Sequence, residues 1–136
     1  MERPRTQTRA MALRYIDDDI VELNVTPGWD EMETAEIANE NISAFIDLIE
    51  GQKVAVLVIM PNHHLLPEAR KAYRDRSVAM HCIALVAPSS LKKLIASLLI
   101  STFGSRAPAP TKVFKSKRDA LDWIHSKFLA DNSNAT

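Results

Sequence analysis

Residues 54–60 read Val-Ala-Val-Leu-Val-Ile-Met, an unbroken apolar run that is rich in β-branched side chains. Residues 83–87 read Ile-Ala-Leu-Val-Ala and form a second run of the same kind. Such runs are typical of strands that are covered on both faces, because a strand with one wet face alternates between apolar and polar residues. The two runs therefore predict neighbouring central strands of an α/β sheet.

A long helix is predicted before the first central strand. Asp30, with Glu33 three residues later, resembles a capping box, and Gly51 provides the stop near Glu50. A second, weaker apolar cluster on the far side of this helix includes Ile37 and Leu48. The main apolar face, which is expected to lie on the sheet, is formed by Ala35, Ala38, Ile42, Phe45, Ile46 and Ile49.

Three further helices are predicted towards the C-terminus. Pro67 has a fixed φ that suits a first turn, and a short charged helix follows over residues 68–76. Another helix extends from the serines at 89–90 to about Phe103. Ser116, with an aspartate three residues later, resembles a cap and begins the last helix.

The remaining strands complete a mixed sheet. Residues 11–16 and 20–26 are separated by three aspartates and predict a β-hairpin, and residues 111–115 alternate as a short strand. The element order is β-β-α-β-α-β-α-β-α, with about five strands and four helices. We expect one domain over residues 11–129, between a flexible arm at 1–10 and a flexible tail at 130–136.

Composition argues against several classes of partner. Lysine plus arginine equals aspartate plus glutamate, 17 each, so no global field attracts nucleic acid or an anionic membrane. The single cysteine, Cys82, excludes an intrachain disulfide, and its apolar neighbours predict a buried structural thiol. No signal segment and no membrane-length apolar run is present, so the cytoplasm is the expected compartment.

Several stretches together resemble the SpoIIAA-like, or STAS-like, fold of bacterial anti-sigma-factor antagonists. The similarity covers roughly Met11 to Leu129. It implies an α/β scaffold with a role in protein interaction or regulation. The stretches that carry the resemblance are the hairpin Tyr15-Ile16-Asp17-Asp18-Asp19-Ile20-Val21, the strand over residues 54–60 with its following loop and short helix, and Lys112-Val113-Phe114 followed by Ala120-Leu121-Asp122-Trp123-Ile124.

In that family the working part is the loop after the central strand, where an aspartate and a phosphorylatable serine or threonine lie at a helix N-terminus. Here residues 59–68 read Ile-Met-Pro-Asn-His-His-Leu-Leu-Pro-Glu. This stretch holds neither an aspartate nor a hydroxyl group, so no kinase-operated switch is expected at the loop. The resemblance therefore implies a non-enzymatic interaction or regulatory module that lacks the phosphorylatable residue.

The same loop is the candidate ligand site, because open α/β folds bind ligands at the carboxyl ends of their strands. Its candidate residues are Asn62, His63, His64 and Arg70. A histidine pair can bind metal or transfer protons, but adjacent residues point apart and no helix-spaced third ligand follows. No catalytic motif, metal site or cofactor is therefore predicted. A small-molecule binder or an enzyme that uses the 62–66 loop is the alternative function.

An interface between two copies of the chain is also predicted. Ile100 and Phe103 project from the expected core face of their helix, as Ile37 and Leu48 do from theirs. Together these residues form more apolar surface than a monomer exposes, which indicates a homodimer. Shallow contact with lipid and cover by the C-terminal segment are the alternatives, and membrane contact is not the expected one.

Overall fold

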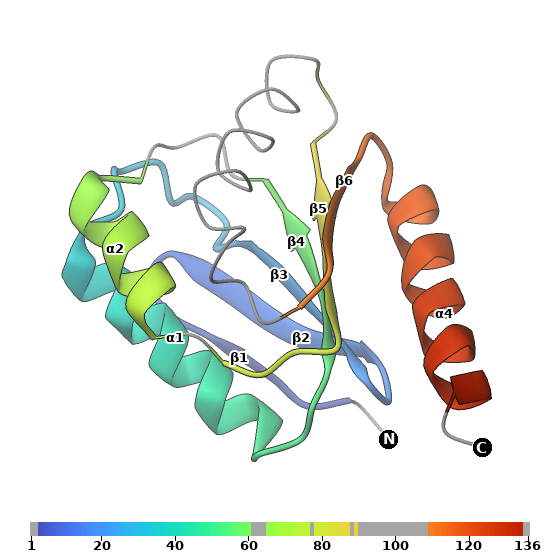
Figure 1. The fold of residues 1–136 in the computed structure, drawn as a ribbon. Coiled ribbons are helices and arrows are strands. Elements are labelled where there is room, and N and C mark those ends of the chain that lie inside the picture. Colours follow the sequence, from blue (N-terminus) through green and yellow to red (C-terminus); the bar gives the residue numbers. More distant parts are fainter. Residues whose placement is uncertain (1–2, 61–64, 77, 88, 90–108, 135–136) are drawn as a thin grey trace.

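The computed structural model describes residues 3–60, 65–76, 78–87, 89 and 109–134, with residues 131–134 described by their backbone alone. Its centre is a mixed β-sheet of six strands (Figure 1). The strands are β1 (Arg5–Gln7), β2 (Met11–Asp17), β3 (Ile20–Val25), β4 (Ala55–Ile59), β5 (Cys82–Val86) and β6 (Thr111–Phe114).

The six strands lie side by side in the order of the sequence. β1, β2 and β3 pair antiparallel, whereas β3 to β6 pair parallel. The β2–β3 pair is the hairpin that the sequence predicts, with its turn at Asp18 and Asp19. The α/β class is thus confirmed, and the sheet has six strands where about five were expected.

β4 and β5 are neighbours at the centre of the sheet, as their two apolar runs predict. Val56 pairs with Ile83 and Leu57 pairs with Ala84. Val56 and Leu57 point to opposite faces of the sheet, yet their exposed fractions are only 2% and 0%. Both faces of β4 are therefore covered by other parts of the protein.

The described helices form a layer on each side of the sheet (Figure 1). α1 (Ala35–Ile49) and α2 (Pro67–Asp75) pack against each other on one face, and α4 (Lys117–Asn134) lies on the other. Proline occupies the first turn of α2, and the Ser116 hydroxyl accepts a 3.2 Å hydrogen bond from the amide of Asp119 at the start of α4. Both helix starts agree with the sequence prediction.

The two faces of the sheet have separate apolar cores. On the α1 face the largest contributors are Leu13, Val21, Phe45 and Val56. On the α4 face a second cluster contains Ile20, Leu57, Cys82, Ala84, Ala120 and Ile124. Cys82, the single cysteine of the chain, is fully buried in this second cluster.

The start of α1 differs from the prediction. Thr34, not Asp30, caps the helix, because its hydroxyl accepts a 3.3 Å hydrogen bond from the amide of Ile37. Glu33 therefore lies outside the helix and makes no capping box. Gly51 does follow the helix end, with φ of +80°, a left-handed conformation that glycine adopts without steric cost.

The buried face of α1 is rotated from the predicted one as well. Ile37, predicted at a dimer interface, is only 7% exposed and belongs to the core, whereas Ile46, predicted in the core, is 40% exposed. Leu48, the other proposed interface residue of this helix, is partly buried against the α1-face cluster. α2 packs beside α1 on this side of the sheet.

Both chain ends are more regular than expected. Residues 1–10 are predicted to be a flexible arm, but Arg5–Gln7 pair with β2 as an edge strand. Residues 130–136 are predicted to be a flexible tail, but the backbone of α4 continues to Asn134. The helix predicted from the serines at 89–90 to Phe103 lies outside the described residues, apart from Ser89.

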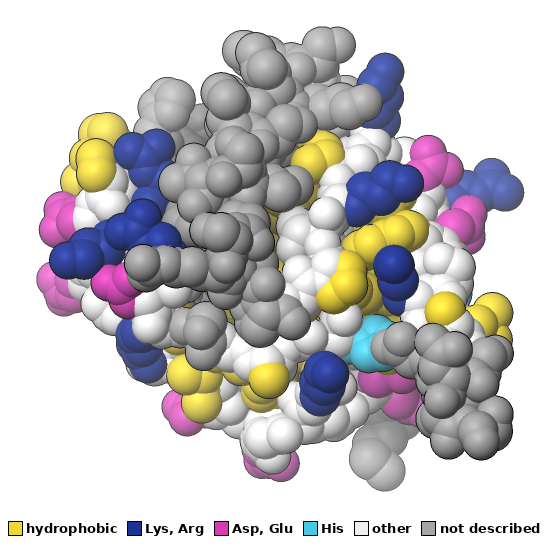
Figure 2. Space-filling view, viewed as in Figure 1, with side chains coloured by type: hydrophobic (Ala, Val, Ile, Leu, Met, Phe, Trp, Pro, Cys, Tyr) yellow, Lys and Arg dark blue, Asp and Glu magenta, His cyan; other side chains and the backbone are white. Residues whose placement is uncertain are grey.

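None of the helices in the described ranges has both the length and the apolar character needed to cross a bilayer. Figure 2 shows cationic and acidic side chains together on the face that it presents, both over α1 and α2 and near α4. This mixture agrees with the formal net charge of zero.

Replacement of Ile124 by alanine should lower the free energy of unfolding by about 3 kcal/mol, because this fully buried side chain joins α4 to the sheet. Leu129→Ala, on the same helix but at a position 68% exposed, should change it by less than about 0.5 kcal/mol. Urea denaturation of both variants measures the difference. Equal losses in the two variants would show that α4 does not pack as described.

Candidate functional site

The predicted ligand loop is only partly described. Asn62, His63 and His64 lie outside the described residues, and Arg70 is exposed on α2. The end of the loop is placed by the backbone of Glu33, which forms a parallel bridge with Leu65 and accepts a 3.0 Å hydrogen bond from the amide of Leu66. The loop therefore ends beside the segment that connects β3 to α1.

A buried polar cluster lies at this point. It consists of Thr8, Glu33, Asn41 and Tyr73, and we call it the Glu33 cluster. Glu33 and Asn41 are 4% and 1% exposed. The Asn41 side-chain amide donates to Oε1 of Glu33 at 3.1 Å and to the Tyr73 hydroxyl at 3.0 Å. The Tyr73 hydroxyl donates to Oε1 of Glu33, and the Thr8 hydroxyl donates to Oδ1 of Asn41.

The protonation of Tyr73 follows from its surroundings. Burial raises the pKa of the Tyr73 hydroxyl well above its usual value, and the nearby Glu33 carboxylate raises it further. Tyr73 therefore keeps its proton at neutral pH and acts as a hydrogen-bond donor to Glu33. This contact fixes α2 against the segment that precedes α1.

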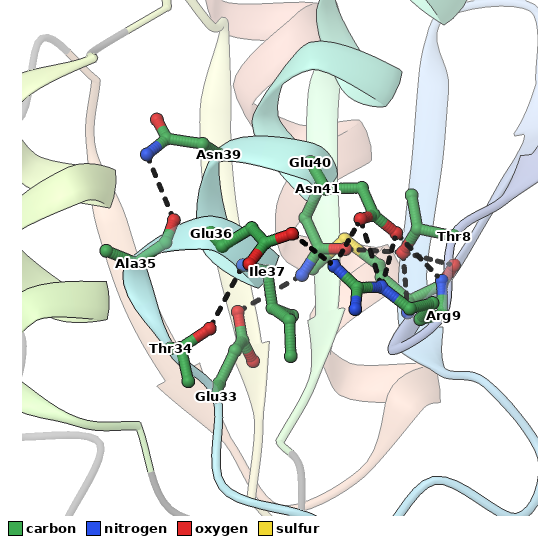
Figure 3. A network of polar contacts seen from close by, with 11 residues as sticks. Thr8, Arg9, Glu33, Thr34, Ala35, Glu36, Ile37, Asn39, Glu40 and Asn41 are labelled. Atoms are coloured by element: carbon green, nitrogen blue, oxygen red, sulfur yellow. Dashed lines mark hydrogen bonds and ion pairs between the residues drawn. The ribbon is translucent and has the colours of Figure 1, made fainter.

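Exposed ion pairs flank the cluster (Figure 3). Arg9 approaches Oε2 of Glu40 at 2.8 Å and Oε1 of Glu36 at 3.3 Å. The hydrogen bond from Arg9 lowers the pKa of Glu40 below its usual value. These contacts join the β1–β2 turn to α1 at the surface, where water screens them.

The geometry makes the Glu33 cluster a brace between three elements. Thr8 comes from the β1–β2 turn, Asn41 from α1 and Tyr73 from α2. A buried hydrogen-bonded network of this kind holds its members in one arrangement, since an unpaired polar group in the interior costs free energy. The cluster can therefore position the loop after β4. Across the described ranges, no three histidine, cysteine, aspartate or glutamate side chains gather closely enough to hold a metal ion.

A second candidate site lies on the other face of the sheet. α4 contacts β4, β5 and β6 and reaches Ile20 and Glu22 of β3, so on that side the described helices leave β1 and most of β2 uncovered. Glu22 of β3, only 4% exposed, receives hydrogen bonds or ion pairs from two cations there. Arg14 contacts Oε1 of Glu22 through Nε at 3.2 Å and Nη2 at 3.1 Å, and Lys117 of α4 approaches Oε2 at 2.5 Å.

Two adjoining open depressions, of about 570 and 640 Å³, mark this uncovered face. They share Arg5 and Arg14, and we call them together the basic groove. Its wall on α4 is the stripe of Lys117, Leu121 and His125, which are four residues apart and thus lie on one side of the helix. The two depressions together follow β2 from Ala12 to Asp17, an arrangement that suits an elongated ligand.

Sequence reasoning missed both sites. Glu33 was assigned to a capping box that does not form. Asn41 was a usable signal, because it is a polar residue on a helix face that is otherwise apolar, next to Ile42 and Ala38. Arg14 and Glu22 lie opposite each other on the two strands of the predicted hairpin. Lys117, which also pairs with Glu22, is distant from both in the sequence.

Comparison with known proteins identifies the family. A family model described as "Domain of unknown function (DUF7793)" matches residues 14–127, which are most of the chain. The chain therefore belongs to this family. No curated protein and no solved structure matches the chain significantly.

Tyr73→Phe should lower the free energy of unfolding by about 1–3 kcal/mol at pH 7, because it removes a buried hydrogen bond to a carboxylate. The native pKa of Tyr73 is raised, so the unfolded chain ionises first as the pH rises past about 10. The stabilisation by Tyr73 should thus be constant below pH 9 and decrease above 10. Urea denaturation across this pH range measures it.

Arg9→Ala is the control for this experiment, because it breaks only exposed ion pairs beside the cluster. It should leave the unfolding free energy nearly unchanged. A Tyr73→Phe variant as stable as the wild type at pH 7 would contradict the role of the cluster as a brace.

Proposed function

We propose that this member of the DUF7793 family is a non-enzymatic regulatory module that binds a protein partner through the basic groove. We further propose a STAS-like scaffold without the phosphorylatable switch residue, and action in the cytoplasm. The observation that carries the binding role is the pair of adjoining depressions beside β1 and β2, on the face that α4 leaves largely uncovered.

The arrangement of elements supports the scaffold part of this proposal. The hairpin of Tyr15 to Val21 lies at β2 and β3, the central strand β4 is followed by a loop and the short α2, and β6 is followed by α4. These are the elements on which the resemblance rests. A scaffold alone carries no activity, so the function must be argued from the site.

The concave shape of the groove is stronger support for a binding role than its exposure to solvent. One face of an antiparallel sheet can simply be wet, and the polar side chains of β1 to β3 suit that situation. Here, however, α4 forms one wall of the first depression through Lys117, Leu121 and His125, and the second depression continues from it along the strands. An open concave surface of this kind suits an extended peptide segment, whereas a small metabolite is bound in a more enclosed pocket.

A small-molecule site at the 62–66 loop is the second candidate function. It is favoured by the position of Glu33, whose backbone bridges Leu65 and whose buried carboxylate lies beside the loop. Its residue Arg70 is exposed at the start of α2. In this alternative the Glu33 cluster would orient the loop around the ligand.

Homodimerisation remains part of the proposal. Ile37 is buried and can no longer contribute to an interface, and Leu48 is partly buried. Ile100 and Phe103, which lie outside the described residues, are the remaining predicted contacts.

Site-specific photocrosslinking tests the proposed function in the cells that produce this protein. A benzoylphenylalanine at Asn24, which is exposed in the groove, should give a discrete adduct with one partner. The same label at Asp47, exposed on α1 in the opposite layer, is the matched control and should give none. An adduct of about twice the 15.2 kDa chain mass would identify a second copy as the partner.

Absence of an adduct at Asn24, or the same adducts from both positions, would contradict the proposed function. The alternative makes a different prediction: a metabolite should raise the thermal midpoint of the wild type by mass action, and His63→Ala should abolish that shift. An Asn24 adduct without any such metabolite supports the interaction module.

A further inference from the structure

We propose that the basic groove binds an acidic, extended peptide segment of a protein partner, a proposal that rests on the proposed function and specifies the partner's chemistry. The occupant lies along β2, with a carboxylate side chain held between Arg5, Arg14 and Lys117. Charge, the order of side chains along the strands and the position of α4 each support this assignment.

The groove is more positive than the protein as a whole. Its lining contains four fixed cations, Arg3, Arg5, Arg14 and Lys117, against the carboxylates of Asp17 and Glu22 and that of Asp18, which pairs with Arg3 at 2.6 Å. The complete chain has a formal net charge of zero. An acidic ligand is therefore attracted to this surface more than to the rest of the molecule.

The central row of the groove consists of charged residues. Arg5 of β1 lies directly opposite Arg14 of β2, which lies opposite Glu22 of β3. Two arginines that are direct neighbours across the strands can contact one carboxylate of a ligand from two sides. Glu22 is nearly buried, and it orients Arg14 and Lys117 from below as a fixed counter-ion.

Arg14 retains hydrogen-bonding capacity towards the groove. Its Nε and Nη2 contact Glu22, whereas its Nη1 makes no hydrogen bond among the described residues. The side chain is 55% exposed, and that of Lys117 is 43% exposed. A guanidinium held in this way presents donors in a fixed direction, which suits a carboxylate acceptor.

The rows on either side of the charged row define the rest of the segment. Towards the hairpin tip the groove is apolar, with Ile16, Ile20 and Leu121. Towards the end away from the hairpin tip, the small side chain of Ala12 lies between the side-chain amides of Gln7 and Asn24, its cross-strand neighbours. Same-face rows of a sheet are about 7 Å apart, which is the spacing of alternate residues in an extended peptide. The groove thus matches an apolar, an acidic and a polar residue at alternate positions.

Fluorescence anisotropy with defined peptides tests this inference on the full chain. The probe is an eight-residue fluorescein-labelled peptide that has one leucine and, after it, glutamate at alternate positions. The matched control peptide has glutamine in place of each glutamate. At low salt the glutamate peptide should bind about tenfold more tightly, and its affinity should fall as NaCl is raised towards about 0.3 M.

Variants locate the binding site. Lys117→Ala and Arg5→Ala should each weaken binding about threefold, and Lys117→Arg should restore it, because the cation is retained. Arg118→Ala is the matched control, since Arg118 is exposed on the same helix but does not line the groove. Urea denaturation confirms that each variant is folded before its affinity is compared.

Three outcomes would overturn the inference: equal binding of the two peptides, equal losses in Lys117→Ala and Arg118→Ala, or tighter binding of an oligothymidylate than of the glutamate peptide. If the peptides fail while Asn24 still crosslinks to a partner, the acidic segment is wrong and the proposed function stands. If neither the peptides nor Asn24 shows binding, both proposals fall.

Discussion

Burial of β4 on both faces, beside a β5 that is buried on the α4 face and half-buried on the other, is the constraint on which the rest of this structure depends. Their apolar side chains point in both directions, so helices must cover the sheet on each side of these two strands. α1, with α2 packed beside it, provides one cover, and α4 provides the other (Figure 1). Because α4 reaches only as far as β3, β1 and most of β2 keep one uncovered face, and the basic groove forms where that cover ends.

Local sequence signals predicted the elements that depend on local chemistry. The apolar run at 54–60, the aspartate turn of the hairpin, Pro67 at the start of α2 and the Ser116 cap of α4 each appear where their patterns indicate. The start of α1 was wrong, because two capping patterns lie within five residues and Glu33 is taken by contacts with Asn41 and Tyr73. β1 was missed, since a three-residue edge strand has no periodicity of its own.

The candidate sites were less predictable, because each joins residues that are far apart in the chain. Glu22 meets Lys117 across almost one hundred positions, and Thr8 meets Asn41 through a turn that pattern analysis treated as part of an arm. Ile37 shows the same effect, since it is only 7% exposed although the periodicity of α1 alone assigns it to solvent. Charge and polarity mark such residues as unusual, but only the pairing of distant elements identifies their partners.

The coincidence of strand order with sequence order has a consequence for biosynthesis. No strand is inserted between two earlier ones, so each newly made strand can add to the existing edge as the nascent chain emerges. The α1 side can be sealed early in this process. The opposite side, with Leu57 and Ala84, stays open to solvent until α4 has left the ribosome, and during that interval it is the surface that a chaperone would have to shield.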